Sequence, residues 1–178
     1  MSDDEPKPGS AEDQGPVTIT PELADRLADK RTDLFEEFEI PDEFPNEVLR
    51  EAETRTEGVY DEIEAEIDER EDLRDLTTWT TDPVDAQDFD DAISIEREEG
   101  AYRLWVHIAD VTHYVTPDTA MWEEAVKRAN TVYLPDYTIH MLPPVLAETV
   151  CSLVPNEDRL AHTVEMEIDD ETLSFEDI

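Results

Sequence analysis

The spacing of the apolar residues changes once along this 178-residue chain, and that change restricts the folds it can adopt. Before about residue 70, apolar side chains recur three or four positions apart, which is the period of an amphipathic helix. From residue 76 they alternate with polar ones, which is the period of a strand with one buried face. The pattern predicts an α+β fold in which N-terminal helices precede a mostly antiparallel sheet.

Two helices are expected before the change of period. Thr20 is a suitable N-cap, Pro21 suits the first helical position, and this pattern ends before Pro41. A second helical pattern begins near Pro45, and Gly58 is expected to kink or divide it. The N-terminal residues mix Pro, Gly, Ser and acids without any period, as a disordered terminus does. We therefore expect a disordered acidic tail over 1–19, a helical acidic segment over 20–70 and a β-rich domain over 71–178.

A hairpin is expected near the middle of the chain. Alternating apolar residues mark two strands, one around Ile93 and Ile95 and one in the segment YRLWVHIADV, and the segment EEG between them supplies the turn. Residues 119–130 are expected to be helical. The three prolines in VYLPDYTIHMLPPVL predict a loop with extended pieces. Residues 159–168 alternate again and predict another strand, and the last residues of the chain predict the start of a partner strand.

The charge excludes an ordinary basic nucleic-acid-binding module, because the formal net charge is −37. The excess of acidic over basic residues is spread along the chain. Residues 1–75 hold 27 acidic and 8 basic residues, and residues 76–178 hold 23 acidic and 5 basic residues. An acidic tail that binds a partner would be concentrated, so we favour adaptation to a cytosol that is molar in salt. The alternative is a disordered acidic protein, against which the regular apolar patterns after residue 75 argue.

A single cysteine, Cys151, cannot form a disulfide within the chain, and no apolar run is long enough to cross a membrane. These features are typical of an intracellular protein. We therefore expect a cytoplasmic chain with no membrane partner.

The densest chemical feature is the segment TDPVDAQDFDDA, whose acidic residues are all aspartates: Asp82, Asp85, Asp88, Asp90 and Asp91. One interpretation is a solvated acidic loop. The other is a cation site, because carboxylates without His or Cys nearby favour Mg²⁺ or Mn²⁺ over zinc. The spacing lacks the glycine and the final glutamate of a calcium EF-hand loop, which excludes that motif. Carboxylates that bind two Mg²⁺ ions are typical of enzymes that cleave phosphodiesters.

A family resemblance extends over about residues 70–170. The segments TDPVDAQDFDDAISIE, YRLWVHIADVTHYV and NTVYLPDYTIHMLPPVLAETVCSLVPNEDRLAHTVEMEI follow in order, and together they resemble the first part of the RNB catalytic domain of the ribonuclease II and ribonuclease R family. The resemblance implies a processive hydrolytic exoribonuclease. Such an enzyme degrades single-stranded RNA from its 3′ end, releases nucleoside 5′-monophosphates and uses Mg²⁺, with Mn²⁺ as the alternative ion.

The resemblance also implies roles for individual residues. Asp82 and Asp91 would hold one metal ion, Asp88 would support it, and Asp90 would serve the second ion and the chemistry. Tyr133, in the segment VYLP, would pack against a base near the 3′ end, a contact worth roughly 1 to 3 kcal/mol per base. The catalytic residues expected from the sequence are therefore Asp88 and Asp90.

The resemblance also shows what the chain lacks. An RNB domain is more than twice the length matched, and its later arginine and aromatic residues are absent from this sequence. We expect the N-terminal part of a catalytic domain, as a disrupted gene, a split protein or a shortened chain would give; in the split protein, a separate polypeptide that carries the remainder would be a partner. The alternative hypotheses are a non-catalytic relative that binds RNA or metal, and an acidic protein that only binds divalent cations.

Three further residues have two interpretations each. Asp110 is expected to cap a turn, and the alternative is that it orients the metal site. Arg128 and Arg159 are among the few basic residues after residue 75, so either is a candidate for contact with phosphate, although Arg159 equally suits a local ion pair.

Overall fold

The structure is a computed structural model that describes residues 19–41, 43–84, 86–134 and 137–177. The disordered tail predicted over 1–19 falls outside these residues, apart from Ile19. Two compact units divide the chain: a helical unit made of residues up to 40 with 135–137, and a sheet unit made of residues 41–134 and 138–178.

The helical unit contains α1 (Pro21–Phe38), which confirms the first predicted helix. Thr20 caps it as expected, because its Oγ1 accepts a hydrogen bond of 3.3 Å from the backbone N–H of Leu23. In the described part of the chain, no helix is both long and apolar enough to span a bilayer.

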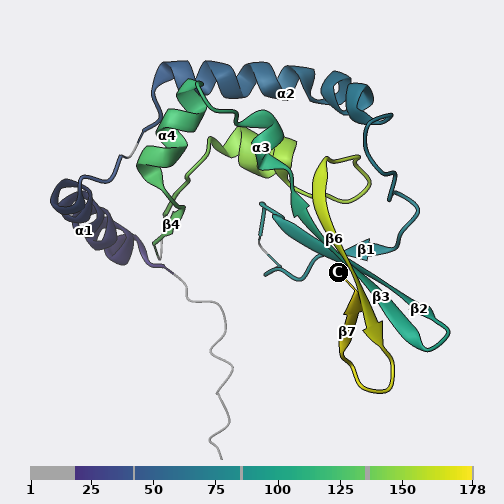
Figure 1. Cartoon of the computed structure of the whole chain (residues 1–178). Helices are drawn as coiled ribbons and strands as arrows, with labels where there is room; N and C mark the ends of the chain where they lie inside the picture. The colour runs from purple at the N-terminus through teal and green to yellow at the C-terminus, as the bar shows by residue number, and fades with distance from the viewer. Residues whose placement is uncertain (1–18, 42, 85, 135–136, 178) are drawn as a thin grey trace, which may run out of the picture. The chain divides into compact units, whose positions relative to one another are not determined.

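The sheet unit is built on five antiparallel strands in the order β1-β2-β3-β6-β7 (Figure 1). The strands are β1 (Thr78–Trp79), β2 (Asp91–Glu98), β3 (Ala101–Ala109), β6 (Ala161–Asp169) and β7 (Phe175–Asp177). Helices come first and an antiparallel sheet follows, so the predicted α+β class is confirmed. The last strand pairs with β6, as the end of the sequence predicts.

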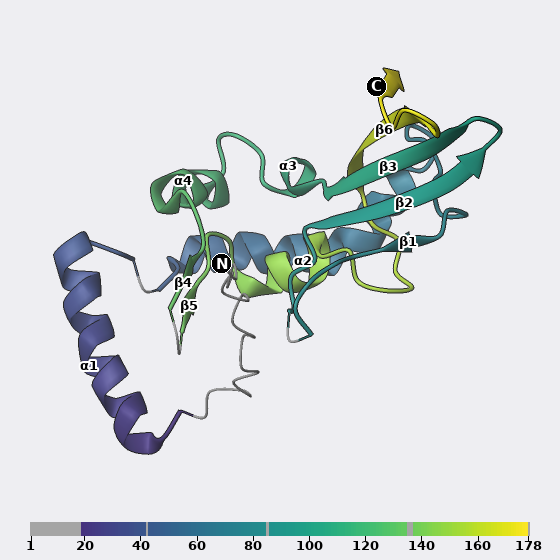
Figure 2. The same cartoon turned by 90° about the horizontal axis from the view of Figure 1, so that it is seen from below.

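The β2–β3 hairpin confirms the predicted turn. Glu98 pairs with Ala101, which leaves Glu99 and Gly100 as the two connecting residues. Gly100 has a φ of 86°, a conformation that costs glycine little and strains other residues. Figures 1 and 2 both show this hairpin as the longest feature of the sheet.

The chain leaves the sheet after β3 and returns in β6, and we call residues 110–160 between them the excursion. It contains α3 (Val111–Tyr114), α4 (Ala120–Arg128), the strand pair β4 (Val132–Tyr133) and β5 (Thr138–Ile139), and the π-helical segment η1 (Leu146–Cys151). The helix predicted over 119–130 is confirmed as α4. The extended pieces of the predicted loop are β4 and β5, whereas α3 and η1 were not predicted.

The core of the sheet unit lies where α2 (Asn46–Glu66) packs against α4 and η1. Its buried residues include Val48, Ala52, Val59, Ile63, Met121, Leu146 and Val150. The helix continues through Gly58 without a break, so the expected division there is wrong. Packing against other elements offsets the low helix propensity of one glycine. Because α2 packs against α4 and η1, it shares one hydrophobic core with the residues after 70.

Candidate active site

The predicted aspartates lie in the sheet unit, at the start of β2. Asp82, Asp88 and Asp90 precede the strand, and Asp91 is its first residue; Asp85 lies outside the described residues. We call residues 87–90 the aspartate loop.

The aspartate loop is held by hydrogen bonds from two other parts of the chain. The carbonyl of Asp90 accepts a bond of 2.9 Å from the N–H of Ala109, at the end of β3. The carbonyl of Phe89 accepts a bond of 2.9 Å from the N–H of Leu153, just after η1. Ser152, which is 0% exposed, adds two side-chain bonds: its Oγ accepts from the N–H of Phe89 at 2.9 Å and donates to the carbonyl of Gln87 at 3.3 Å. The loop is therefore fixed from both sides.

Electrostatics indicate that the four predicted aspartates share one site. The pKa of Asp90 is raised, first because neighbouring atoms desolvate its carboxyl group and then because Asp88, Asp91 and Asp82 repel its negative charge. The residue as a whole is still open to solvent. A bound cation would relieve the same repulsion.

The donor chemistry of this site fits Mg²⁺ or Mn²⁺, since all four side chains offer hard carboxylate oxygens. The carboxylates are spread apart. Among the described residues, no three His, Cys, Asp or Glu side chains lie closely enough together to hold a metal ion. The structure therefore gathers the expected donors in one neighbourhood without bringing three of them into coordinating positions.

Tyr133 lies beside Asp88 and Asp90, although it is 45 and 43 positions away from them in the chain. Desolvation, the negative charges of Asp88 and Asp90, and a hydrogen bond donated to the Asp88 carboxylate all raise the pKa of Tyr133. The residue is 69% exposed, so its ring presents a large surface to solvent. The structure thus brings the predicted base-contacting residue next to the predicted catalytic residues.

Asp110 takes the capping role that we expected of it. Its carboxylate, only 3% exposed, accepts bonds from Arg70 at 2.7 Å, from Thr112 at 2.9 Å and from the N–H of His113, and it pairs with His162 at 3.0 Å. Burial acts to raise the pKa of Asp110, but the hydrogen bonds from Arg70 and Thr112 and the nearby positive charges outweigh it and lower that pKa. These contacts fix the start of α3.

Arg128, a candidate for contact with phosphate, makes its contacts within the fold. Its guanidinium stacks over Phe44 at 3.8 Å, pairs with Glu124 at 2.8 Å, and donates to the carbonyls of His140 and Glu43. All of these groups lie in the sheet unit, and the Arg128 side chain is almost fully buried. It joins α4 to the segment before α2.

Arg159 also holds the fold. It donates to the carbonyls of Ser152 at 3.1 Å, Thr149 at 2.9 Å and Asp158 at 2.7 Å, and its side chain is only 8% exposed. Its longer contact with Glu157, at 3.9 Å, fits the local ion pair considered from the sequence. Arg159 therefore anchors the end of η1.

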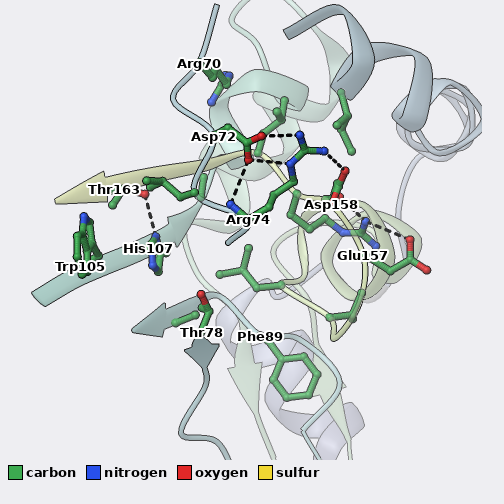
Figure 3. Close-up of a pocket in the computed structure, with 18 of the residues that line it drawn as sticks. Arg70, Asp72, Arg74, Thr78, Phe89, Trp105, His107, Glu157, Asp158 and Thr163 are labelled. Atoms are coloured by element: carbon green, nitrogen blue, oxygen red, sulfur yellow. Dashed lines mark hydrogen bonds and ion pairs between the residues drawn. The ribbon is translucent and has the colours of Figure 1, made fainter. Parts of the chain in front are cut away.

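A pocket of about 1010 Å³ lies on one face of the sheet and was not expected from the sequence (Figure 3). Trp105, His107 and Phe89 line it, and the predicted aspartates do not. His107 lies 3.0 Å from the hydroxyl of Ser94 and 2.9 Å from that of Thr163, and burial lowers its pKa. These two partners lie on β2 and β6, on either side of β3, so only the pairing of the strands reveals them.

Comparison with known proteins gives a consistent result. The family model of the RNB domain matches residues 70–177. Ribonuclease R of Aquifex aeolicus is 46% identical over 138 residues, which are 77% of this chain and 19% of that protein. Ribonuclease R of Thermotoga maritima is 44% identical over 166 residues, which are 92% of this chain and 23% of that protein. The latter alignment is long enough to extend into the helices before residue 70.

The solved structure of Mycoplasma genitalium RNase R in complex with ribose-methylated single-stranded RNA is 31% identical, with a TM-score of 0.74. That match covers 83% of this chain and 22% of the solved one. The chain therefore spans about a fifth of the length of these proteins.

Proposed function

This chain belongs to the RNB-domain family, and from that membership we propose that it forms part of a hydrolytic 3′-to-5′ exoribonuclease. The proposed substrate is single-stranded RNA, and the proposed products are nucleoside 5′-monophosphates. The observation that carries this proposal is the position of the aspartate loop, where Asp90 experiences the charges of three other aspartates and Tyr133 lies beside it.

The aspartates would hold divalent metal, with Mg²⁺ as the proposed ion and Mn²⁺ as the alternative. Asp82 and Asp91 would bind one ion with support from Asp88, and Asp90 would serve the second. When bound, such ions activate water and stabilise the charges that develop on the phosphate oxygens. They would also separate the acidic protein from the phosphates of the substrate.

The remaining contribution of this chain is to position the RNA. The exposed ring of Tyr133 can stack on a base while its hydroxyl stays bonded to Asp88. The hydrogen bonds from Ala109 and Leu153 hold the backbone of the aspartate loop, which would limit the reorganisation that binding of metal and RNA requires.

The length of the chain and its cellular location also bear on its function. The chain spans about a fifth of the length of these relatives, so the proposed activity is that of a whole catalytic domain to which this chain contributes the aspartate site. We also propose that the protein works in the cytoplasm, where its RNA substrate is degraded.

A second candidate function is a non-catalytic relative that binds RNA or metal. The open arrangement of carboxylates favours it, since no three acidic, His or Cys side chains in the described ranges converge on a metal-sized space. In that case Tyr133 would still contact RNA, and the aspartates would bind cations without cleavage.

Degradation of 5′-labelled single-stranded RNA, in molar KCl with Mg²⁺, tests the proposal. The chain should produce a ladder that shortens from the 3′ end, and Asp90→Asn should lower the rate about a hundredfold or more. Asp61→Asn, which changes an exposed aspartate on α2 by the same charge, is the matched control and should leave the rate unchanged. Binding of Mg²⁺ without cleavage by the unsubstituted chain would mean either that cleavage needs more of the RNB domain than this chain supplies or that the chain is the non-catalytic relative.

A further inference from the structure

We propose that Ser152 is a positioning residue, which sets the placement of the Asp88 and Asp90 carboxylates for divalent metal. The inference rests on the proposed function, since it concerns the same site. Ser152 itself offers no carboxylate and is fully buried, so it would act only through the backbone of the aspartate loop.

The first argument is where its two hydrogen bonds fall. The Ser152 hydroxyl accepts from the N–H of Phe89 and donates to the carbonyl of Gln87, and these groups stand on either side of Asp88. A single buried side chain thus fixes the backbone before and after a predicted metal ligand.

The second argument is how the side chains of the loop are distributed. Phe89 lines the pocket on the sheet (Figure 3), whereas its two neighbours Asp88 and Asp90 do not. The bonds of Ser152 therefore hold a backbone conformation in which Phe89 lines the pocket and the carboxylates on either side of it lie outside the pocket.

The third argument is that Ser152 is itself anchored. It directly follows η1, and its carbonyl accepts from the guanidinium of Arg159, which also bonds the carbonyl of Thr149. The next residue, Leu153, donates to the carbonyl of Phe89. The hydroxyl is therefore held on a part of the core rather than on a free loop.

Serine suits this position chemically. Its hydroxyl donates and accepts at once in a very small volume, which alanine cannot do and which cysteine does weakly. Ser152→Ala removes both bonds with almost no change in volume and leaves two backbone groups of the loop without their partner.

The test is the affinity of the 178-residue chain for Mn²⁺, measured by electron paramagnetic resonance in molar KCl. Changing a residue that orients metal ligands typically costs 10- to 100-fold in affinity, so Ser152→Ala should weaken Mn²⁺ binding about tenfold or more. Ser94→Ala is the matched control, because Ser94 is equally buried and loses bonds to Thr78 and His107 but does not touch the aspartate loop. It should keep the affinity of the unsubstituted chain.

The outcomes separate this inference from the proposed function. Asp88→Asn should abolish specific Mn²⁺ binding; if it binds as the unsubstituted chain does, the metal site and the role of Ser152 are both wrong. If Asp88→Asn loses binding while Ser152→Ala binds normally, or Ser94→Ala weakens binding equally, only the role of Ser152 is overturned. Should Ser152→Ala fail to fold, Ser152→Cys gives the answer, with an intermediate affinity expected and an unchanged one contradicting the inference.

Discussion

Asp110 is a buried carboxylate that stabilises the fold through its charge, although the chain carries a large excess of acidic residues. Its partners lower its pKa below the ordinary value of 3.8, so the group binds protons less readily in the folded than in the unfolded chain. The stabilisation is therefore complete above the unfolded pKa, near 4, and is lost as the pH falls through the lower, folded pKa.

We expect Asp110→Asn to lower the free energy of unfolding by about 2 kcal/mol at neutral pH, because charged hydrogen bonds to a buried group are lost. Urea unfolding of both proteins, in constant KCl from neutral pH to below pH 4, measures the effect. The difference between the two should shrink as the pH falls below 4. A difference that stays constant with pH would mean that the charge of Asp110 does not contribute.

Sequence and structure agree unevenly at the scale of single residues. The family resemblance singles out four aspartates and Tyr133, and the structure brings them into one neighbourhood, while their individual roles stay predictions. Ser152 and His107 could not be recognised in this way. Their importance comes from partners on other strands and loops, which a local pattern does not specify.

At the scale of elements, the N-terminus of α4 depends on another helix. Thr119 caps it locally, and the Glu51 carboxylate, from α2, accepts bonds from the N–H groups of Ala120 at 3.1 Å and Met121 at 2.8 Å. Both an unpaired N–H and the helix dipole favour a negative charge at this position.

Glu51→Gln should therefore destabilise the sheet unit by about 1 kcal/mol, since it removes the charge but keeps one oxygen. Thermal unfolding in molar KCl is the measurement. Glu53→Gln, an exposed glutamate on the same helix, should have a much smaller effect. Equal shifts for the two variants would contradict the proposed capping by Glu51.

The elements with a clear period were predictable, and the short ones were not. The hairpin and α4 follow from apolar spacing and from Gly100, which supplies the turn. Neither α3, with four residues, nor η1, with six, is long enough to show a period. Each depends on tertiary contacts: Asp110 caps α3, and Leu146 and Val150 place η1 in the core.

For the whole molecule, the formal charge of −37 makes salt concentration the condition that most affects the stability of the fold. At molar ionic strength the Debye length is about 3 Å, so repulsion among exposed carboxylates is largely screened. We expect the unfolding midpoint, followed by far-UV circular dichroism, to rise with KCl up to molar concentration. NaCl at the same ionic strength should act similarly, and a midpoint that does not depend on salt would contradict the prediction of halophilic adaptation.

The fold class is the level that the sequence predicted best, since helices followed by an antiparallel sheet is the observed order. The sequence pattern did not show that α2 packs with the excursion rather than standing apart from the sheet. Amphipathic spacing identifies the buried face of a helix but not the element that covers it.

The long excursion has a consequence for how the protein folds. The β2–β3 hairpin joins neighbouring segments, but β3 meets β6 only after residues 110–160 have closed into a loop. Closing long loops delays the contacts that depend on them. Ser152 and Leu153 lie within that loop, so their bonds to the aspartate loop depend on its closure, whereas the bond from Ala109 to Asp90 can form together with the hairpin.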